Sequence, residues 1–222
     1  MQSKLLLLYS VFITTACAQT PQSIGTNIAD KQKKPEDTLE CSNFKFKDAN
    51  QRADTLKKYA MVDDPVAVER FFCAFPNSFK EMEDLFGYSE QTKAAPLYRR
   101  VDGAPILEYF KNLTTISKAD YYNRYINICV GGVWEADHIR VAFDIDEKLI
   151  NDTHAVCTEL SKRTDEDIAS VFRFIFDGPH PQNFGNEYRY KALLPRLNSY
   201  SARLGKLLTQ AYKQVMRTTH GH

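Results

Sequence analysis

The sequence lacks the features that mark most enzymes and nucleic-acid-binding proteins. Its 29 Lys and Arg residues nearly balance its 28 Asp and Glu residues. Nucleic-acid binding relies on a basic surface that displaces counterions from phosphates, and neither the net charge nor any basic run offers one, so no nucleic-acid partner is expected. The sequence also has no G-x-S-x-G elbow, no H-E-x-x-H helix and no phosphate-cradling glycine loop. No common catalytic signature is therefore present, and no cofactor is expected.

Metal and transmembrane signatures are missing as well. Five cysteines are present, and no two of them have the C-x-x-C spacing that is common in zinc sites. No metal site is expected. No apolar run reaches the roughly 20 residues of a transmembrane helix, and no Lys/Arg-rich amphipathic surface helix stands out. Any membrane contact is therefore expected to come from the N-terminus.

The N-terminus has the layout of an export signal. Lys4 is followed by an apolar run from Leu5 to Ile13 and by small residues at 16–18. A positive start, a short apolar segment and a small-residue cleavage site are typical of secretory signal peptides. The sequence therefore predicts an exported protein with residues 1–16 as its signal peptide.

Two processing sites fit this signal. Thr14-Thr15-Ala16-Cys17 resembles the lipobox of bacterial lipoproteins, although that motif usually has leucine where Thr14 stands. The resemblance covers the first seventeen residues. It implies that Cys17 is acylated and that the protein is a periplasmic or outer-membrane-associated lipoprotein, held at the membrane by this anchor. Alternatively, Ala16-Cys17-Ala18 is an ordinary A-x-A site cut before Gln19, so the choice between signal peptidase II and signal peptidase I stays open.

The rest of the chain divides into a tether, a domain and a tail. Residues 17–40 are polar and without apolar periodicity, which is typical of a flexible tether and favours the lipoprotein interpretation. Residues 41–217 are long enough for a single helical domain with a normal core. Residues 218–222 are polar, and we expect a disordered tail.

Four cysteines remain once Cys17 is acylated or discarded. An even number permits two disulfides in an oxidising compartment, and the sequence leaves the pairing of the four open. Cys73, Cys129 and Cys157 lie in apolar runs, where free cysteine behaves as a small hydrophobic residue. Burial in the core is the favoured interpretation for these three; the fourth is Cys41.

Helix signals recur along the predicted domain. The expected N-caps, each followed by apolar residues at helical spacing, are Asp64, Ser78, Ser117 and Thr164. Gly87 is expected to end one helix in a left-handed turn, and Gly131-Gly132 to end another. The apolar stripe from Leu197 to Val215 predicts a long final helix that Pro195 starts or kinks.

These signals predict an all-α fold, either a compact helical bundle or an irregular helical array. The aromatic residues that fall within the predicted helices are expected to form its core. An α+β alternative has a hairpin around residues 124–146: apolar residues occupy every second position from Ile139 to Ile145 and from Ile126 to Val130, as in half-buried strands. The capped start at Ser117 favours the helix.

Two short segments carry side chains suited to recognition or catalysis. The candidate binding residues are Trp134, Glu135, His138, Asp177, His180 and Asn183. Prolines on both sides of His180 would present it rigidly, which suits a histidine that transfers protons or contacts a partner. The nearby Phe184, Asn186 and Tyr188 would enlarge this surface. A structural role is the simpler interpretation of both segments.

Two functions fit these features. The preferred one is an exported, lipid-anchored helical protein that acts by binding a protein partner, as an immunity-type or inhibitor-type protein or as an envelope assembly factor. This is an analogy from location and fold class. The rival is an envelope hydrolase using His180 with Asp177 or Glu135, which would require these side chains to meet in one concave pocket.

Overall fold

The computed structural model describes residues 40–90, 93–133, 144–178, 182 and 184–217. All of them belong to one compact unit. Its helices are η1 (Cys41–Asn43), α1 (Ala49–Tyr59), α2 (Pro65–Ala74), α3 (Phe79–Phe86), α4 (Arg100–Lys111), α5 (Lys118–Cys129), α7 (Ile145–Asn151), α8 (Thr153–Ser161), α9 (Asp165–Phe176), α10 (Phe184–Tyr200) and α11 (Ala202–Arg217). Two short strands, β1 (Tyr88–Ser89) and β2 (Lys93–Ala94), pair antiparallel.

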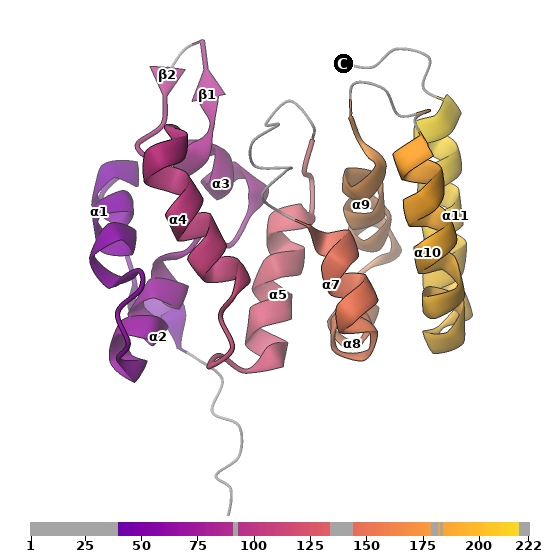
Figure 1. The fold of residues 1–222 in the computed structure, drawn as a ribbon, viewed down its shortest axis with the longest axis horizontal. Helices are drawn as coiled ribbons and strands as arrows, with labels where there is room; N and C mark the ends of the chain where they lie inside the picture. Colours follow the sequence, from indigo (N-terminus) through magenta and orange to yellow (C-terminus); the bar gives the residue numbers. More distant parts are fainter. Residues whose placement is uncertain (1–39, 91–92, 134–143, 179–181, 183, 218–222) are drawn as a thin grey trace, which may run out of the picture. The chain divides into compact units, whose positions relative to one another are not determined.

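Helices that follow one another in the sequence lie close together, so the colours of Figure 1 follow the chain across the array from α1 and α2 to α10 and α11. The middle helix is α5, which packs against α3 on one side and against α7, α8 and α9 on the other. α11 packs on α9 and α10, and α10 also contacts α7 and α8. The predicted all-α class is confirmed, in the form of an irregular helical array.

Side-chain caps begin several of these helices. All four predicted N-caps are present: Asp64, Ser78, Ser117 and Thr164 each accept a hydrogen bond from the backbone N–H three residues later. Asp48 caps α1 in the same way, and this helix start was not predicted. Each such cap stabilises its helix by about 1 kcal/mol.

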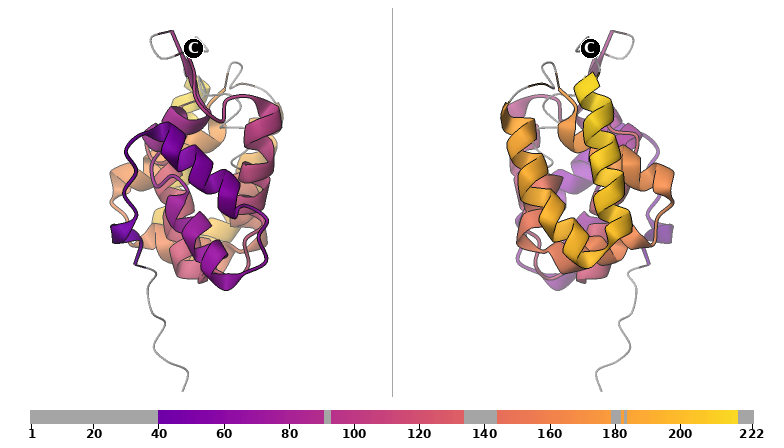
Figure 2. Two further views of the ribbon diagram at one scale, coloured as in Figure 1. Left: turned by 90° about the vertical axis from the view of Figure 1, so that its left-hand side faces the viewer. Right: turned by 90° about the vertical axis from the view of Figure 1, so that its right-hand side faces the viewer.

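The predicted long final helix is wrong. The chain breaks at Ser201 and folds back, so that α10 and α11 form an antiparallel hairpin (Figure 2, right). A Cβ on Gly205 would collide with the side-chain amide of Asn198, which shows how closely the two helices approach near the turn. The apolar spacing continues through Ser201 because residues on both sides of the break face the core. Pro195 lies inside α10.

The alternative hairpin at 124–146 is wrong in its first strand, since Ile126 and Ile128 belong to α5. Helices cover α5 on two sides, and residues at most of its positions from 121 to 129 are buried. Apolar residues can then alternate without forming a strand. Positions 134–143, which hold most of the second predicted strand, lie outside the described residues.

Two glycines were predicted to end helices. Gly131, just after α5, has a φ of 74°, in the left-handed region that favours glycine. Gly87 ends α3 with an extended backbone, so the predicted left-handed turn is wrong there. Glycine is needed at position 87 for space, because a Cβ would lie 2.6 Å from the carbonyl oxygen of Glu83.

Aromatic side chains form much of the core, as predicted. The ring of Phe110 stacks on that of Phe75 with centroids 3.8 Å apart. The guanidinium of Arg124, on α5, is buried beside them and donates hydrogen bonds to the carbonyl oxygens of Phe72 and Phe75 at 2.6 and 2.5 Å. These carbonyls end α2, so Arg124 places a positive charge at the negative end of that helix.

Within the described residues, a disulfide joins Cys41 to Cys73 and thereby fastens η1 to α2. The interpretation of Cys73 as an unbonded core residue is wrong: it is buried, but the fold brings η1 within bonding reach of it. Cys129 and Cys157 are free and buried, as predicted. Burial raises the pKa of the Cys157 thiol to about 12, so this thiol is unreactive in the native protein.

The predicted signal peptide, the tether up to residue 39 and the tail at 218–222 lie outside the described residues. Among the helices that the structure describes, none has the length and apolar character needed to cross a membrane.

Candidate functional site

Most of the predicted binding residues cannot be placed. Trp134, Glu135, His138, His180 and Asn183 lie outside the described residues, and so does the predicted meeting of His180 with a carboxylate. Asp177 is described, and it ends α9.

The carboxylate of Asp177 takes part in a local structural network. Its side chain is 11% exposed, and Oδ2 lies 3.4 Å from a guanidinium nitrogen of Arg173. Oδ1 accepts a hydrogen bond from the backbone N–H of Gly178 at 3.1 Å. Arg173 also donates to the carbonyl oxygen of Gly132 at 2.8 Å. Asp177 therefore helps to fasten the end of α9 to the segment after α5.

The three residues expected to enlarge this surface have different roles. Asn186 is buried, and its amide nitrogen donates to the carbonyl oxygen of Phe176 at 2.7 Å. Its inclusion in a recognition surface is wrong, because it satisfies the last turn of α9 from within the core. Phe184 and Tyr188 are on the surface, 92% and 75% exposed.

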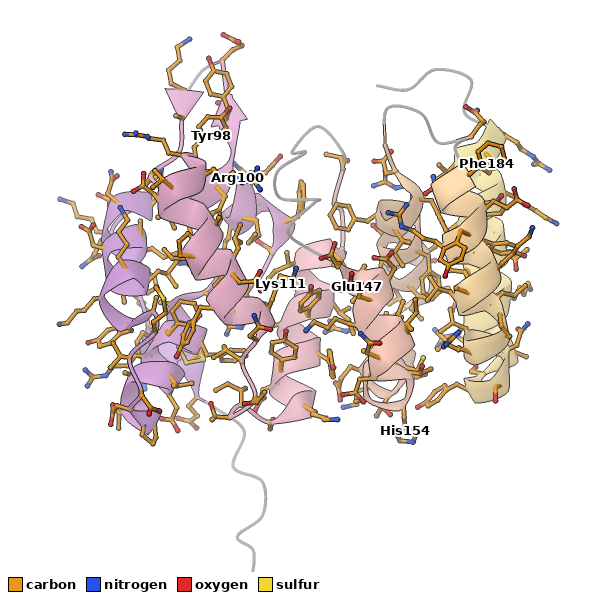
Figure 3. The ribbon with its side chains drawn as sticks, viewed as in Figure 1. Tyr98, Arg100, Lys111, Glu147, His154 and Phe184 are labelled. Atoms are coloured by element: carbon orange, nitrogen blue, oxygen red, sulfur yellow. A yellow bond between two sulfur atoms is a disulfide. The ribbon has the colours of Figure 1, made fainter. Side chains whose placement is uncertain are left out.

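A second exposed surface lies where the β-hairpin meets the start of α4. We call it the Tyr88–Tyr98 patch and define it as Tyr88, Tyr98, Arg99, Arg100 and Val101. Figure 3 shows Tyr98 and Arg100 at this junction. The two tyrosine rings contact each other with centroids 5.6 Å apart. Their exposed fractions are 51% and 40%, and Val101 is 71% exposed.

The backbone beneath this patch is tied to the helical scaffold. The N–H of Leu97 donates to the carbonyl oxygen of Leu85 at 2.8 Å, and the N–H of Ala95 donates to that of Gly87 at 3.0 Å. A Cβ on Gly103 would collide with the carbonyl oxygen of Leu97, so this loop lies directly on α4. The exposed side chains are thus presented by a fixed backbone, which lowers the entropic cost of binding a partner.

The two arginines of the patch carry unneutralised charge. Both are exposed, and neither guanidinium group forms an ion pair or hydrogen bond with any residue that the structure describes. No side chain caps the start of α4, so the positive end of its dipole adds to these charges. Tyrosine and arginine are the side chains that most often dominate binding energy at protein interfaces. The patch is therefore suited to a protein partner with acidic or hydrogen-bond-accepting groups.

A cavity of about 830 Å³ opens between the segment before α1, α3 and the end of the hairpin. Arg52 and Glu81, both in its lining, form an ion pair of 3.0 Å, and the guanidinium of Arg52 also lies over the ring of Phe46 at 5.0 Å. The lining contains no Ser, Thr, Cys, His or Tyr. The cavity has the size of a ligand site, and the ionisable side chains of its described lining are Lys45, Arg52 and four carboxylates.

No cluster of three or more His, Cys, Asp and Glu side chains suited to a metal occurs among the described residues. The Tyr88–Tyr98 patch was not predicted, because its residues form no recognisable motif. The available signal was the segment Tyr98-Arg99-Arg100, which combines an aromatic and two basic residues outside any predicted helix.

No protein-family model, curated protein or solved structure matches the chain.

Proposed function

We propose that this chain is an exported protein, anchored by a lipid on Cys17, that acts by binding a protein partner through the Tyr88–Tyr98 patch. One observation carries the binding function: two exposed tyrosines in contact with each other lie beside two exposed arginines that have no partner within the described residues. The exposure of aromatic rings to water is unfavourable, so burying them against a partner would stabilise the complex. The partner would be a toxic enzyme that the protein inhibits or a component of the cell envelope.

The export proposal has separate support. Disulfides form and persist in oxidising compartments such as the bacterial periplasm and are rare in the cytosol, and Cys41 is bonded to Cys73. The bond also lies just after the predicted tether, so a tether anchored at Cys17 would join the folded domain at a cross-linked residue.

The binding proposal is tested by affinity capture from detergent extracts, with and without crosslinking. The wild type is compared with a Tyr98→Ala/Arg100→Glu variant. A matched control, Lys57→Glu/Val66→Ala, changes an exposed cation on α1 and an exposed apolar side chain on α2 instead. We expect a partner that the wild type and the control recover and that the patch variant loses by about tenfold or more. Equal recovery by all three proteins would exclude the patch as the binding surface.

The anchor is tested independently by metabolic labelling with palmitate. We expect the wild type to take up label and Cys17→Ala to take up none. Label that survives the substitution would contradict acylation at Cys17, whatever the capture experiment shows.

A further inference from the structure

The balanced overall charge conceals a basic helical hairpin. From Phe184 to Arg217 the sequence has seven Lys and Arg residues and a single carboxylate, Glu187. Residues 144–178, which form α7, α8 and α9, have nine Asp and Glu residues against four Lys and Arg. The charges are therefore segregated, and the basic hairpin forms the outer layer on its side of the array (Figure 2, right).

The expectation that the chain has no Lys/Arg-rich amphipathic surface helix is wrong. α11 carries four basic residues and no acidic one, and it buries an apolar stripe that begins at Leu204. This helix was not predicted because the charge was considered over the whole chain and the apolar stripe from Leu197 to Val215 merged α11 with the end of α10.

The outward sides of α10 and α11 form two parallel stripes. On each helix the outward positions are spaced by four, three and four residues, opposite the buried side. They are Phe184, Tyr188, Lys191 and Pro195 on α10 and Lys206, Gln210, Lys213 and Arg217 on α11, and all eight are exposed. We call this set the hairpin face.

The basic side chains of the hairpin face are mostly unneutralised. Other basic residues of the hairpin do pair with the acidic layer: Arg189 lies 2.8 Å from Asp146, and Arg203 lies 2.6 Å from Asp165. Lys191 pairs with Glu187. On α11, by contrast, Lys206, Lys213 and Arg217 form no ion pair with any described residue. They give this face an uncompensated positive charge.

Two aromatic rings protrude beside these charges. Phe184 and Tyr188 are the most exposed of the large hydrophobic side chains that the structure describes, and they lie one helical turn apart. The first turn of α10 is next to the last turn of α11, because Gln182 donates a hydrogen bond to the carbonyl oxygen of Met216 at 3.4 Å. Figure 3 shows Phe184 at this end of the hairpin. The rings and the cations of Lys213 and Arg217 thus occupy the same end of one face.

We propose that the hairpin face docks on a membrane surface of anionic lipids. Phe184 and Tyr188 insert at the level of the headgroups, and the basic residues of α11 contact lipid phosphates. Basic residues together with protruding aromatic rings are typical of proteins that lie on membranes, and lysine, which supplies three of the four cations, is depleted at protein–protein interfaces. The proposal rests on the export and anchoring proposed above.

Vesicle flotation tests this proposal without the acyl chain. The processed chain, residues 17–222 with Cys17→Ala, is mixed with vesicles of phosphatidylglycerol and phosphatidylethanolamine, or with vesicles of phosphatidylcholine alone. We expect binding to the anionic vesicles only, weakened by salt. In that background, Lys206→Glu/Lys213→Glu/Arg217→Glu should reduce binding on the order of 100-fold or more. Phe184→Ser/Tyr188→Ser should reduce it about tenfold and abolish the fraction that remains bound at high salt.

The matched control is Lys45→Glu/Lys47→Glu/Lys57→Glu, which makes the same change in net charge at exposed positions before and in α1. Its binding to anionic vesicles should fall far less. Equal losses in the control and in the α11 variant would overturn the proposal, because net charge alone would then explain binding. Binding of the wild-type surface to polyglutamate but not to the vesicles would also overturn it and assign the face to an acidic protein. If the wild-type surface binds no vesicles while the Tyr88–Tyr98 patch still captures a partner, this inference alone is refuted. If the wild type takes up no palmitate label, the anchor alone is refuted.

Discussion

Tyr190 of α10 lies face to face with Tyr212 of α11, with ring centroids 4.2 Å apart and planes within 6° of each other. The hydroxyl groups of Tyr190 and Thr209 are 3.1 Å apart. The ring of Tyr212 also lies in a T-shaped arrangement with that of Phe176, with centroids 5.2 Å apart. This stack holds the two final helices antiparallel and fastens them to α9. The same contact therefore places the outward stripes of both helices side by side.

The stack is testable by a double-mutant cycle. Tyr190→Ala and Tyr212→Ala should each destabilise the protein, and the double variant should lose less than the sum, with a coupling energy of about 1 kcal/mol. Urea unfolding of the four proteins measures this energy. If the losses of the two single variants add exactly in the double variant, the contact between the rings contributes no stability of its own.

The buried charge of Arg124 should be important for stability. Its guanidinium lies 4.3 Å from the centre of the Phe72 ring and satisfies the last carbonyls of α2, and burial lowers its pKa to about 10. Arg124→Met leaves two buried carbonyl oxygens without this donor, and we expect the free energy of unfolding to fall by about 2–3 kcal/mol. Arg203→Met removes an exposed arginine and should cost much less. A loss of similar size in both variants would contradict the capping role.

The disulfide should stabilise the native state and account for the thiol count. Cys41→Ala/Cys73→Ala should lower the free energy of unfolding by about 2–4 kcal/mol, and reductant should have the same effect on the wild type. In a Cys17→Ala background, no thiol should react with a thiol reagent in the native protein, since Cys129 and Cys157 are buried. Two should react after unfolding without reductant, and four with it. Four reactive thiols without reductant would contradict the bond.

The tyrosines of α5 predict how stability depends on alkaline pH. Burial is the largest cause that raises the pKa values of Tyr121, Tyr122 and Tyr125 above their usual value. A raised native pKa adds stability that is fully present below the unfolded pKa of about 10 and is lost as pH rises above it. Lys148 and Arg124 act in the opposite direction, because burial lowers the pKa of each, but they are two groups against three.

We therefore expect the free energy of unfolding to fall as pH rises above about 10. Ultraviolet titration should show tyrosines that ionise only when the protein unfolds. Tyr122→Phe should make the pH dependence less steep, whereas Tyr188→Phe, at an exposed position, should leave it unchanged. Titration of every tyrosine in the folded protein would contradict the burial of this cluster.

Local signals in the sequence predicted helices well where a capping side chain begins them. Ser78 and Thr164 show this, because N-cap preference depends on a few neighbouring residues. The same reasoning failed at Ser201: apolar spacing reports which side of the chain is buried, and it continues unchanged through a turn that keeps the same side inward. The alternation around Ile126 misled for a related reason: α5 is covered on two sides, so Ile126 and Ile128 are both buried and its unburied stripe is narrow.

The candidate surfaces were harder to predict. Tyr88 and Tyr98 are ten residues apart, and they come together only because the hairpin returns the chain to the start of α4. The hairpin face likewise depends on α10 and α11 lying antiparallel. Asn186 was assigned to the surface because it lies close to His180 in the sequence, but its amide donates to the last turn of α9 inside the core.

Site-specific photocrosslinking tests the central claim most directly, namely that the chain binds a protein partner through the Tyr88–Tyr98 patch. A photoreactive residue replaces Tyr98 in one protein and Lys57, an exposed residue of α1, in another. Both are expressed in intact cells and irradiated. The account predicts a discrete crosslinked protein at position 98 that is absent at position 57 and is lost when Arg100→Glu is added. Crosslinks that are equal at the two positions, or that survive Arg100→Glu unchanged, would contradict it.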